Sequence, residues 1–136
     1  MRGLPIILVG ATLAGCAATA EQPMRSAQKQ QEYQQLIAGK VAGPPVSCLP
    51  TYNANDMIVI DEQTIAFRQG SSRVYIAHMP GGCSNLGRPP YTMVTKQFGS
   101  AQLCRGDIAR IVDPVNRITV GSCVFGDFTP YARAGG

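Results

Sequence analysis

Short apolar segments separated by turn residues dominate the chain from residue 44 onward. The apolar run Met57–Ile60 ends at Asp61, and the segments Thr64–Arg68 and Arg73–Ala77 flank a Gln-Gly-Ser-Ser turn that is typical of a hairpin. Further short strands are expected at Tyr91–Lys96, Ile108–Val112, Ile118–Val120 and Cys123–Phe125, with an extended end at Pro130. About six short strands without a long helix between them predict a mainly β fold, a small antiparallel barrel or sandwich.

A helical pattern precedes these strands. The segment from Pro23 to Ala38 is rich in Gln, a good helix former, with Pro23 suited to the first helical position and Gly39 to the residue after the end. Its only apolar patch comprises Tyr33, Leu36 and Ile37, about one turn of the helix. We therefore expect a solvated helix whose last turn docks on the domain, and we prefer this interpretation to a partner-binding helix.

An apolar run of about ten residues, Leu4–Leu13, lies near the start of the chain and is too short to span a bilayer, which needs about 20 residues. It has the length of a signal-peptide core. The Leu13-Ala14-Gly15-Cys16 sequence that closes it resembles the lipobox of bacterial lipoproteins. That resemblance implies cleavage before Cys16, lipidation of its sulfur and usually N-acylation, with palmitate as a typical acyl group. The alternative is an ordinary secretory signal with a chance cysteine.

These features divide the chain into a signal peptide (residues 1–15), a lipidated tether with a short helix (16–43), the β domain (44–131) and a tail (132–136). Ala17 follows the lipidated cysteine. An Asp at that position commonly marks inner-membrane retention in lipoproteins, so the resemblance favours the outer membrane, with the domain facing the periplasm. The expected partners are the membrane, through the lipid anchor, and an envelope protein or ligand.

The four cysteines beyond Cys16 are expected to form two disulfides, because thiols oxidise outside the cytoplasm. They are far apart in the sequence, whereas zinc sites use close pairs, and the chain has one histidine, so no metal is expected. Of the three possible pairings, Cys48–Cys123 with Cys83–Cys104 closes the longest loop, and we favour it. The sequential pairing, Cys48–Cys83 with Cys104–Cys123, is the alternative that we also consider.

Charge excludes one class of partner. The net charge is +4, and the basic residues are scattered singly instead of clustering in a stripe. Nucleic-acid binding normally shows such a stripe together with motif support. We therefore expect no nucleic-acid partner.

The cysteines and their neighbours also carry a resemblance. Cys83 in a loop, then Leu103-Cys104-x-Gly106-Asp107-Ile108, then Cys123-x-x-Gly126-x-Phe128-x-Pro130, is similar to an uncharacterised family of small exported proteobacterial proteins. The resemblance covers roughly residues 46–131. It implies a four-cysteine β-rich domain and supplies no catalytic residues.

No catalytic constellation accompanies the candidate residues. His78 would need a nucleophile such as Ser84 and an orienting Asp, but no Gly-x-Ser-x-Gly elbow is present. Gly106-Asp107 and Gly126-Asp127 are interpreted as tight turns instead of calcium ligands. The aromatic residues are expected to form the core: Tyr75, Tyr91, Phe125, Phe128 and Tyr131.

The sequence thus predicts a cell-envelope lipoprotein that is a non-catalytic binding or interaction module, without a cofactor. The alternatives are an inhibitor or accessory of an envelope enzyme and, third, a small hydrolase.

Overall fold

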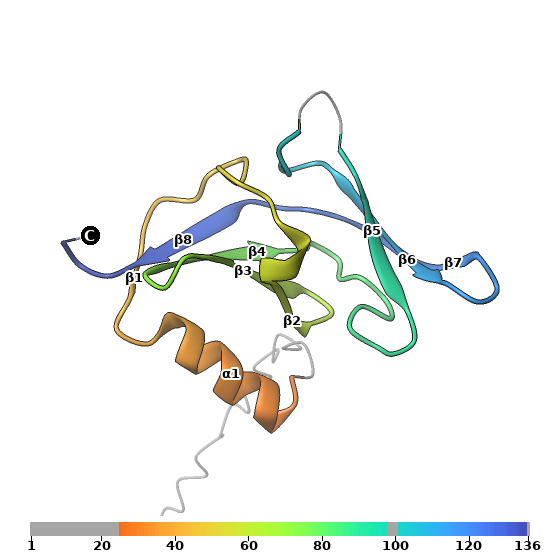
Figure 1. The fold of residues 1–136 in the computed structure, drawn as a ribbon, viewed down its shortest axis with the longest axis horizontal. Coiled ribbons are helices and arrows are strands. Elements are labelled where there is room, and N and C mark those ends of the chain that lie inside the picture. The colour runs from red at the N-terminus through yellow and green to blue at the C-terminus, as the bar shows by residue number, and fades with distance from the viewer. Residues whose placement is uncertain (1–24, 98–100, 136) are drawn as a thin grey trace, which may run out of the picture.

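The computed structural model describes residues 25–97 and 101–135, which form one helix, a single 3-10 turn and two antiparallel sheets (Figure 1). The sheets have the strand orders β1-β8-β4-β3-β2 and β5-β6-β7. The elements are α1 (Ala27–Ile37), η1 (Ala54–Asp56), β1 (Val41–Ala42), β2 (Met57–Asp61), β3 (Thr64–Gln69), β4 (Arg73–His78), β5 (Thr92–Lys96), β6 (Ile108–Asp113), β7 (Ile118–Val124) and β8 (Phe128–Ala132).

The prediction of a mainly β, antiparallel fold with a preceding helix and two disulfides is confirmed, and the two sheets do not close into a barrel. In Figure 1 the three-stranded sheet lies beside the five-stranded sheet, and α1 lies below the latter. The proposed signal peptide and the lipidation site Cys16 lie outside the described residues. The expected helix start at Pro23 is wrong, because the helix begins at Ala27, after an extended Ser26. No helix in the described part of the chain has the length and apolar character needed to cross a bilayer.

Alternation along β3 and β4 gives the five-stranded sheet two buried faces. On one face, Ile65, Phe67 and Tyr75 join the main core, which also includes Phe125 and Phe128. On the other face lies a smaller cluster comprising Ala66, Val74, Ile76 and Ile60 of the sheet and Leu36 of α1. The expected docking of the last turn of α1 is confirmed, since Tyr33 and Ile37 pack against the same cluster.

Local signals fix both ends of α1. The side chain of Ser26 accepts a hydrogen bond from the backbone N–H of Lys29 at 3.2 Å, so Ser26 is the N-cap and the helix begins at Ala27. Gly39 has a φ of +69° just beyond the helix, as the sequence predicted for the residue after the end. The Lys40 ammonium donates to the carbonyl of Leu36 at 2.8 Å and satisfies one terminal acceptor.

The disulfides are Cys48–Cys104 and Cys83–Cys123, so the favoured pairing of Cys48 with Cys123 and Cys83 with Cys104 is wrong. The sequential alternative is wrong as well. Cys48 and Cys104 face each other across an isolated antiparallel bridge, whereas Cys123 is buried on β7 and bonds to the buried Cys83. Loop-closure entropy changes only slowly with loop length, so the packing of the two sheets decides the pairing.

Candidate binding groove along β2

A groove of about 720 Å³ runs along β2, between the first turn of α1 and the loop of residues 81–88. We call it the β2 groove. Ligand pockets in proteins commonly have volumes of about 300–1,000 Å³. β2 is the last strand of its sheet and, in the described residues, pairs only with β3. The groove is lined by Ser26 and Lys29, by Met57–Asp61 with Glu62 and Gln63, and by Gly81, Gly82, Ser84, Leu86, Gly87 and Arg88.

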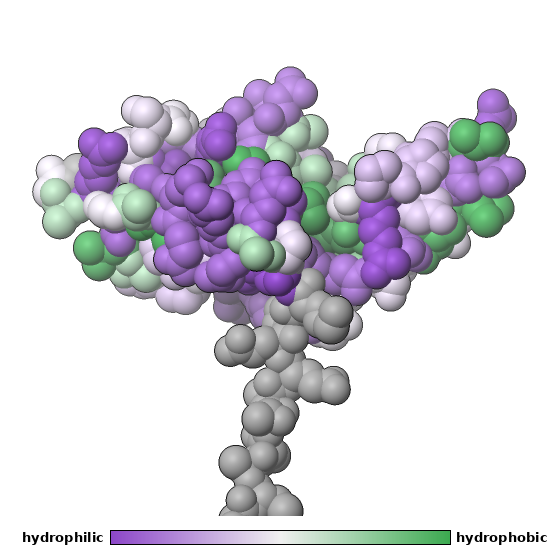
Figure 2. Space-filling model, turned by 90° about the horizontal axis from the view of Figure 1, so that it is seen from below, coloured by the Kyte–Doolittle hydropathy of each residue, from purple (hydrophilic) through white to green (hydrophobic). Residues whose placement is uncertain are grey.

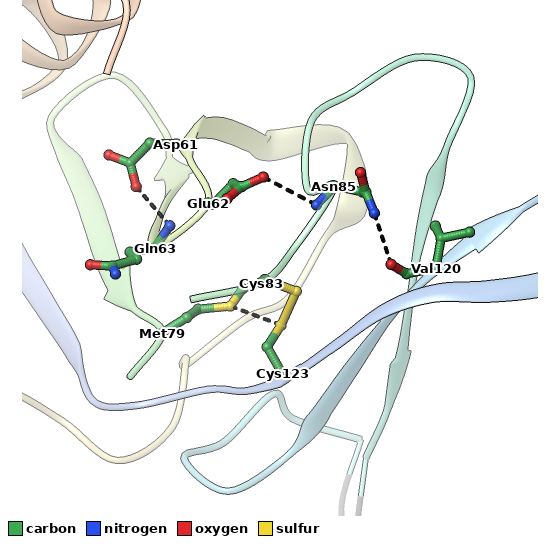
Figure 3. Close-up of a disulfide and its surroundings, with 8 residues drawn as sticks. All are labelled: Asp61, Glu62, Gln63, Met79, Cys83, Asn85, Val120 and Cys123. Carbon is green, nitrogen blue, oxygen red and sulfur yellow. Dashed lines mark hydrogen bonds between the residues drawn. A yellow bond between two sulfur atoms is a disulfide. The ribbon is translucent and has the colours of Figure 1, made fainter. Parts of the chain in front are cut away.

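The loop of residues 81–88, which forms one wall of the groove, is held in place at Cys83 and Asn85 (Figure 3). Cys83 is tied to β7 by its disulfide with Cys123, and its backbone N–H donates to the carbonyl of Glu62 at 2.7 Å. The backbone N–H of Asn85 donates to a Glu62 carboxylate oxygen at 3.2 Å, and its side-chain amide donates to the carbonyl of Val120 at 2.8 Å. The loop therefore bridges the β2–β3 turn and the three-stranded sheet.

Two glycines allow the loop to approach its neighbours closely. A Cβ added at Gly121, inside β7, would collide with the backbone carbonyl of Ser84. A Cβ at Gly87 would lie 2.8 Å from a Val59 methyl, and Gly87 also has a φ of +75°. Gly121 was the available sequence signal for this contact, because a glycine inside a strand pattern often marks close approach of another backbone.

An ion pair fixes the helix wall. The Arg25 guanidinium lies 2.8 Å from an Asp61 carboxylate oxygen and 4.5 Å from the centre of the Tyr33 ring. The side chain of Asp61 is only 3% exposed, and its other oxygen accepts the backbone N–H of Gln63 at 2.7 Å. Arg25 therefore links the residue before α1 to the end of β2, which holds the first turn of the helix beside the strand edge.

Each charged side chain in the groove lining has a partner of opposite charge. Lys29 pairs with Glu32 at 2.7 Å, and Arg88 pairs with Glu62 at 3.5 Å, in addition to the Asp61 pair. Both additional pairs are substantially exposed and contribute little to stability. Between the helix and the five-stranded sheet, burial and a hydrogen bond with Tyr131 raise the pKa of the Tyr33 phenol above its ordinary value.

The groove contains Ser84, but the other residues of the hydrolase hypothesis are placed differently. His78 is the exposed last residue of β4, and no hydrogen bond joins it to Ser84 within the described residues. Residues 25–97 and 101–135 contain no group of three or more His, Cys, Asp or Glu side chains that is arranged to hold a metal ion. In the described residues, His78 and Ser84 are thus not joined as the hydrolase hypothesis would require.

The predicted turn carboxylates have separate structural roles. Asp107 accepts the backbone N–H of Cys104 at 2.7 Å, as the turn interpretation predicted. Asp127 instead pairs with Arg105 at 3.0 Å on the surface. Asp113 accepts hydrogen bonds from the side chain and backbone of Asn116 and from the backbone of Val115, which hold its pKa below the ordinary value.

The aromatic residues expected in the core are there or at its border. Tyr75, Phe125 and Phe128 are buried, while Tyr91 and Tyr131 are partly buried against the two clusters. None of them lines the β2 groove. Figure 2 shows mainly hydrophilic side chains over the helix and green, hydrophobic groups toward the end of the three-stranded sheet, where Val115 and Ile118 are exposed.

Comparison with known proteins gives one match. Residues 1–125 match a family of unknown function, DUF6491. No curated protein and no solved structure matches the chain.

Proposed function

The chain belongs to DUF6491, a family of unknown function, and we propose that it is a cell-envelope lipoprotein whose β-rich domain is a non-catalytic binding module. The β2 groove is the binding site in this proposal. A lipid group on Cys16 attaches the protein to the outer membrane, and the domain faces the periplasm.

The observation that carries the binding role is a groove with fixed walls beside the outer edge of β2. Its walls are held by the Cys83–Cys123 disulfide on one side and by the Arg25–Asp61 ion pair on the other. A preformed site lowers the conformational entropy that is lost on binding. The groove therefore suits recognition of a ligand.

The anchoring role is supported by the Leu13-Ala14-Gly15-Cys16 sequence at the end of a short apolar run. Each buried methylene of an acyl chain contributes about 0.8 kcal/mol, so two or more chains on Cys16 give stable membrane attachment. With Cys16 as the first residue, eight residues (17–24) lie between the lipidated cysteine and Arg25.

The lipid anchor is tested by Cys16→Ser. The variant should remain as an uncleaved precursor and should take up no radiolabelled palmitate, while the wild-type chain is cleaved and labelled. If the variant were still cleaved to a soluble periplasmic form, the segment would be an ordinary secretory signal.

The binding role is tested by site-specific photocrosslinking in intact cells. A photoreactive amino acid replaces Ser84, an exposed residue of the groove wall, or Ser72, an equally exposed serine outside the groove. We expect a discrete adduct with an envelope protein from position 84 and none from position 72. Adducts from position 72 alone would place the binding surface elsewhere, and the absence of any adduct would contradict the binding role.

A further inference from the structure

The first four residues of β2 lack the charged residues and proline that commonly protect edge strands. Natural sheets block exposed edges with charged side chains, proline or strong bulges, because unpaired N–H and C=O groups attract other strands. The first four residues of β2, Met57-Ile58-Val59-Ile60, contain neither charge nor proline. The one irregularity is a register shift near the hairpin end, between Val59 and Asp61. An unprotected edge of this kind is suited to pairing with another strand.

The groove exposes backbone on both sides of the available space. The floor is the β2 edge, and the loop wall contains Gly81, which has no side chain to keep an incoming chain away. A Cβ built on Gly81 meets no atom within 4 Å, so the space beside it is open. Glycine at such positions permits close approach of another backbone. An extended peptide segment is the occupant whose main chain can use these groups.

The charge and shape of the groove indicate which kind of extended segment it can bind. The four charged lining residues, Lys29, Asp61, Glu62 and Arg88, each have an oppositely charged partner. The groove therefore has no net charge to be neutralised, and a matching segment is uncharged over its central residues. A second copy of the chain would present an edge that is itself flanked by α1 and by the 81–88 loop, whereas an isolated segment brings no such walls.

We propose that the β2 groove binds an uncharged, extended segment of a partner protein by β-strand addition to β2. This proposal rests on the proposed binding function and names the chemistry of its ligand. The five residues of β2 pair with a segment of similar length, which spans about 17 Å at 3.4 Å per residue. Main-chain hydrogen bonds hold the segment, and its alternate side chains contact the two walls.

The probe is the acetylated and amidated heptapeptide SVTVTVS with alternate backbone amides N-methylated. This single-edge peptide keeps one row of hydrogen-bonding groups and cannot associate with itself into a sheet. Its control has the same side chains with every amide N-methylated, so that no backbone donor remains. Binding to the fluorescein-labelled peptide is measured with the full chain in detergent by fluorescence anisotropy.

We expect the single-edge peptide to bind at least about tenfold more tightly than its fully methylated control, because only the former can extend the sheet. Gly81→Gln should weaken this binding by about tenfold or more, since the new side chain occupies the open space of the groove. Gly70→Gln is the matched control. Gly70 has a similar positive φ of +66° and equally open surroundings but lies outside the groove, so binding should stay within about twofold of wild type.

Several results would overturn the proposal. Equal binding of the two peptides, or no binding of either at millimolar concentration, would exclude strand addition. If photocrosslinking from position 84 succeeded at the same time, the binding function would stand and recognition would depend on side chains. Binding that appeared only after residues 17–24 were replaced by Gly and Ser would make this segment of the chain the occupant. Release of a dimer to monomers by the peptide, seen by ultracentrifugation, would make a second copy the occupant.

Discussion

The two disulfides are expected to differ in their contribution to stability, and in the opposite order to their loop lengths. The comparison uses two double variants, Cys83→Ala with Cys123→Ala and Cys48→Ala with Cys104→Ala. Chain entropy alone makes the Cys48–Cys104 bond slightly more stabilising, because it joins residues 56 apart, against 40 for Cys83–Cys123. Burial makes the Cys83–Cys123 bond more stabilising, and the structure gives the size of the entropic effect and of the burial effect.

The entropic contribution of a cross-link is about 4.2 kcal/mol for a separation of 56 residues and about 3.9 kcal/mol for 40, a difference of about 0.3 kcal/mol. Cys83 is 0% and Cys123 is 7% exposed, and the Cys123 sulfur lies 3.4 Å from the Met79 sulfur in the core (Figure 3). Removing one buried heavy atom from each site adds about 0.5–1.5 kcal/mol per site. Loss of Cys83–Cys123 should therefore cost about 6 kcal/mol, against about 4–5 kcal/mol for the partly exposed Cys48–Cys104.

The free energies of unfolding are compared by guanidinium denaturation followed by far-UV circular dichroism. A natural domain has a total stability of about 5–15 kcal/mol, so the Cys83/Cys123 variant is expected to be marginally folded or unfolded without denaturant. The Cys48/Cys104 variant should retain a cooperative transition at a lowered midpoint. Equal destabilisation, or a greater loss in the Cys48/Cys104 variant, would refute the argument that burial outweighs loop length.

Three further predictions concern the walls of the groove and one turn. Gly121→Ala should lower the free energy of unfolding by about 3 kcal/mol, because the new Cβ collides with the Ser84 carbonyl. Gly39→Ala is the control: its Cβ meets no atom, so only the positive φ lowers the free energy of unfolding, by about 1 kcal/mol. Denaturation midpoints measure both. Arg25→Ala should cost about 2 kcal/mol by leaving the buried Asp61 without its ion-pair partner, and Lys29→Ala, in an exposed pair, less than about 0.5 kcal/mol; equal losses would contradict this reasoning. Because the pKa of Asp113 is lowered in the folded chain, its carboxylate stabilises the fold fully above the pKa of the unfolded chain, and this stabilisation is lost as pH falls through the lower folded pKa. The thermal midpoint of Asp113→Ala should therefore fall less than that of wild type across this acidic interval. Carbon-13 NMR titration of the carboxyl measures the folded pKa, and an ordinary value would contradict the prediction.

The elements that depend on local sequence could be predicted. Alternation and turn residues located β3 and β4, and the expected strands Ile108–Val112 and Ile118–Val120 lie within β6 and β7. The short patch on α1 and Gly39 indicated both the docked face and the end of the helix. In each case the determining interactions lie within a few residues of one another, so the sequence pattern carries them.

Features that depend on distant segments were missed or mistaken. β1 has only two residues, Val41 and Ala42, and exists because β8 provides its partner. The disulfide pairing likewise depends on how the sheets meet, since Cys48 reaches Cys104 through an isolated bridge and β7 brings Cys123 to Cys83. Loop length, the one quantity that the sequence supplies, differs too little in its energetic effect to decide between pairings.

The β2 groove depends both on the local sequence of β2 and on distant segments that pack beside it. The continuous apolar run Met57–Ile60 is typical of a strand buried on both sides, yet the structure places it at the edge of its sheet, with Met57, Ile58 and Val59 only partly buried. A sequence suited to the interior at an exposed edge is a conflict between local and global structure, and such conflicts are expected at functional sites. Pairing with an extended segment would bury the apolar side chains and satisfy the free backbone groups of β2. This conflict is the reason why the proposed strand addition is assigned to β2 and not to a charged or aromatic residue of the domain.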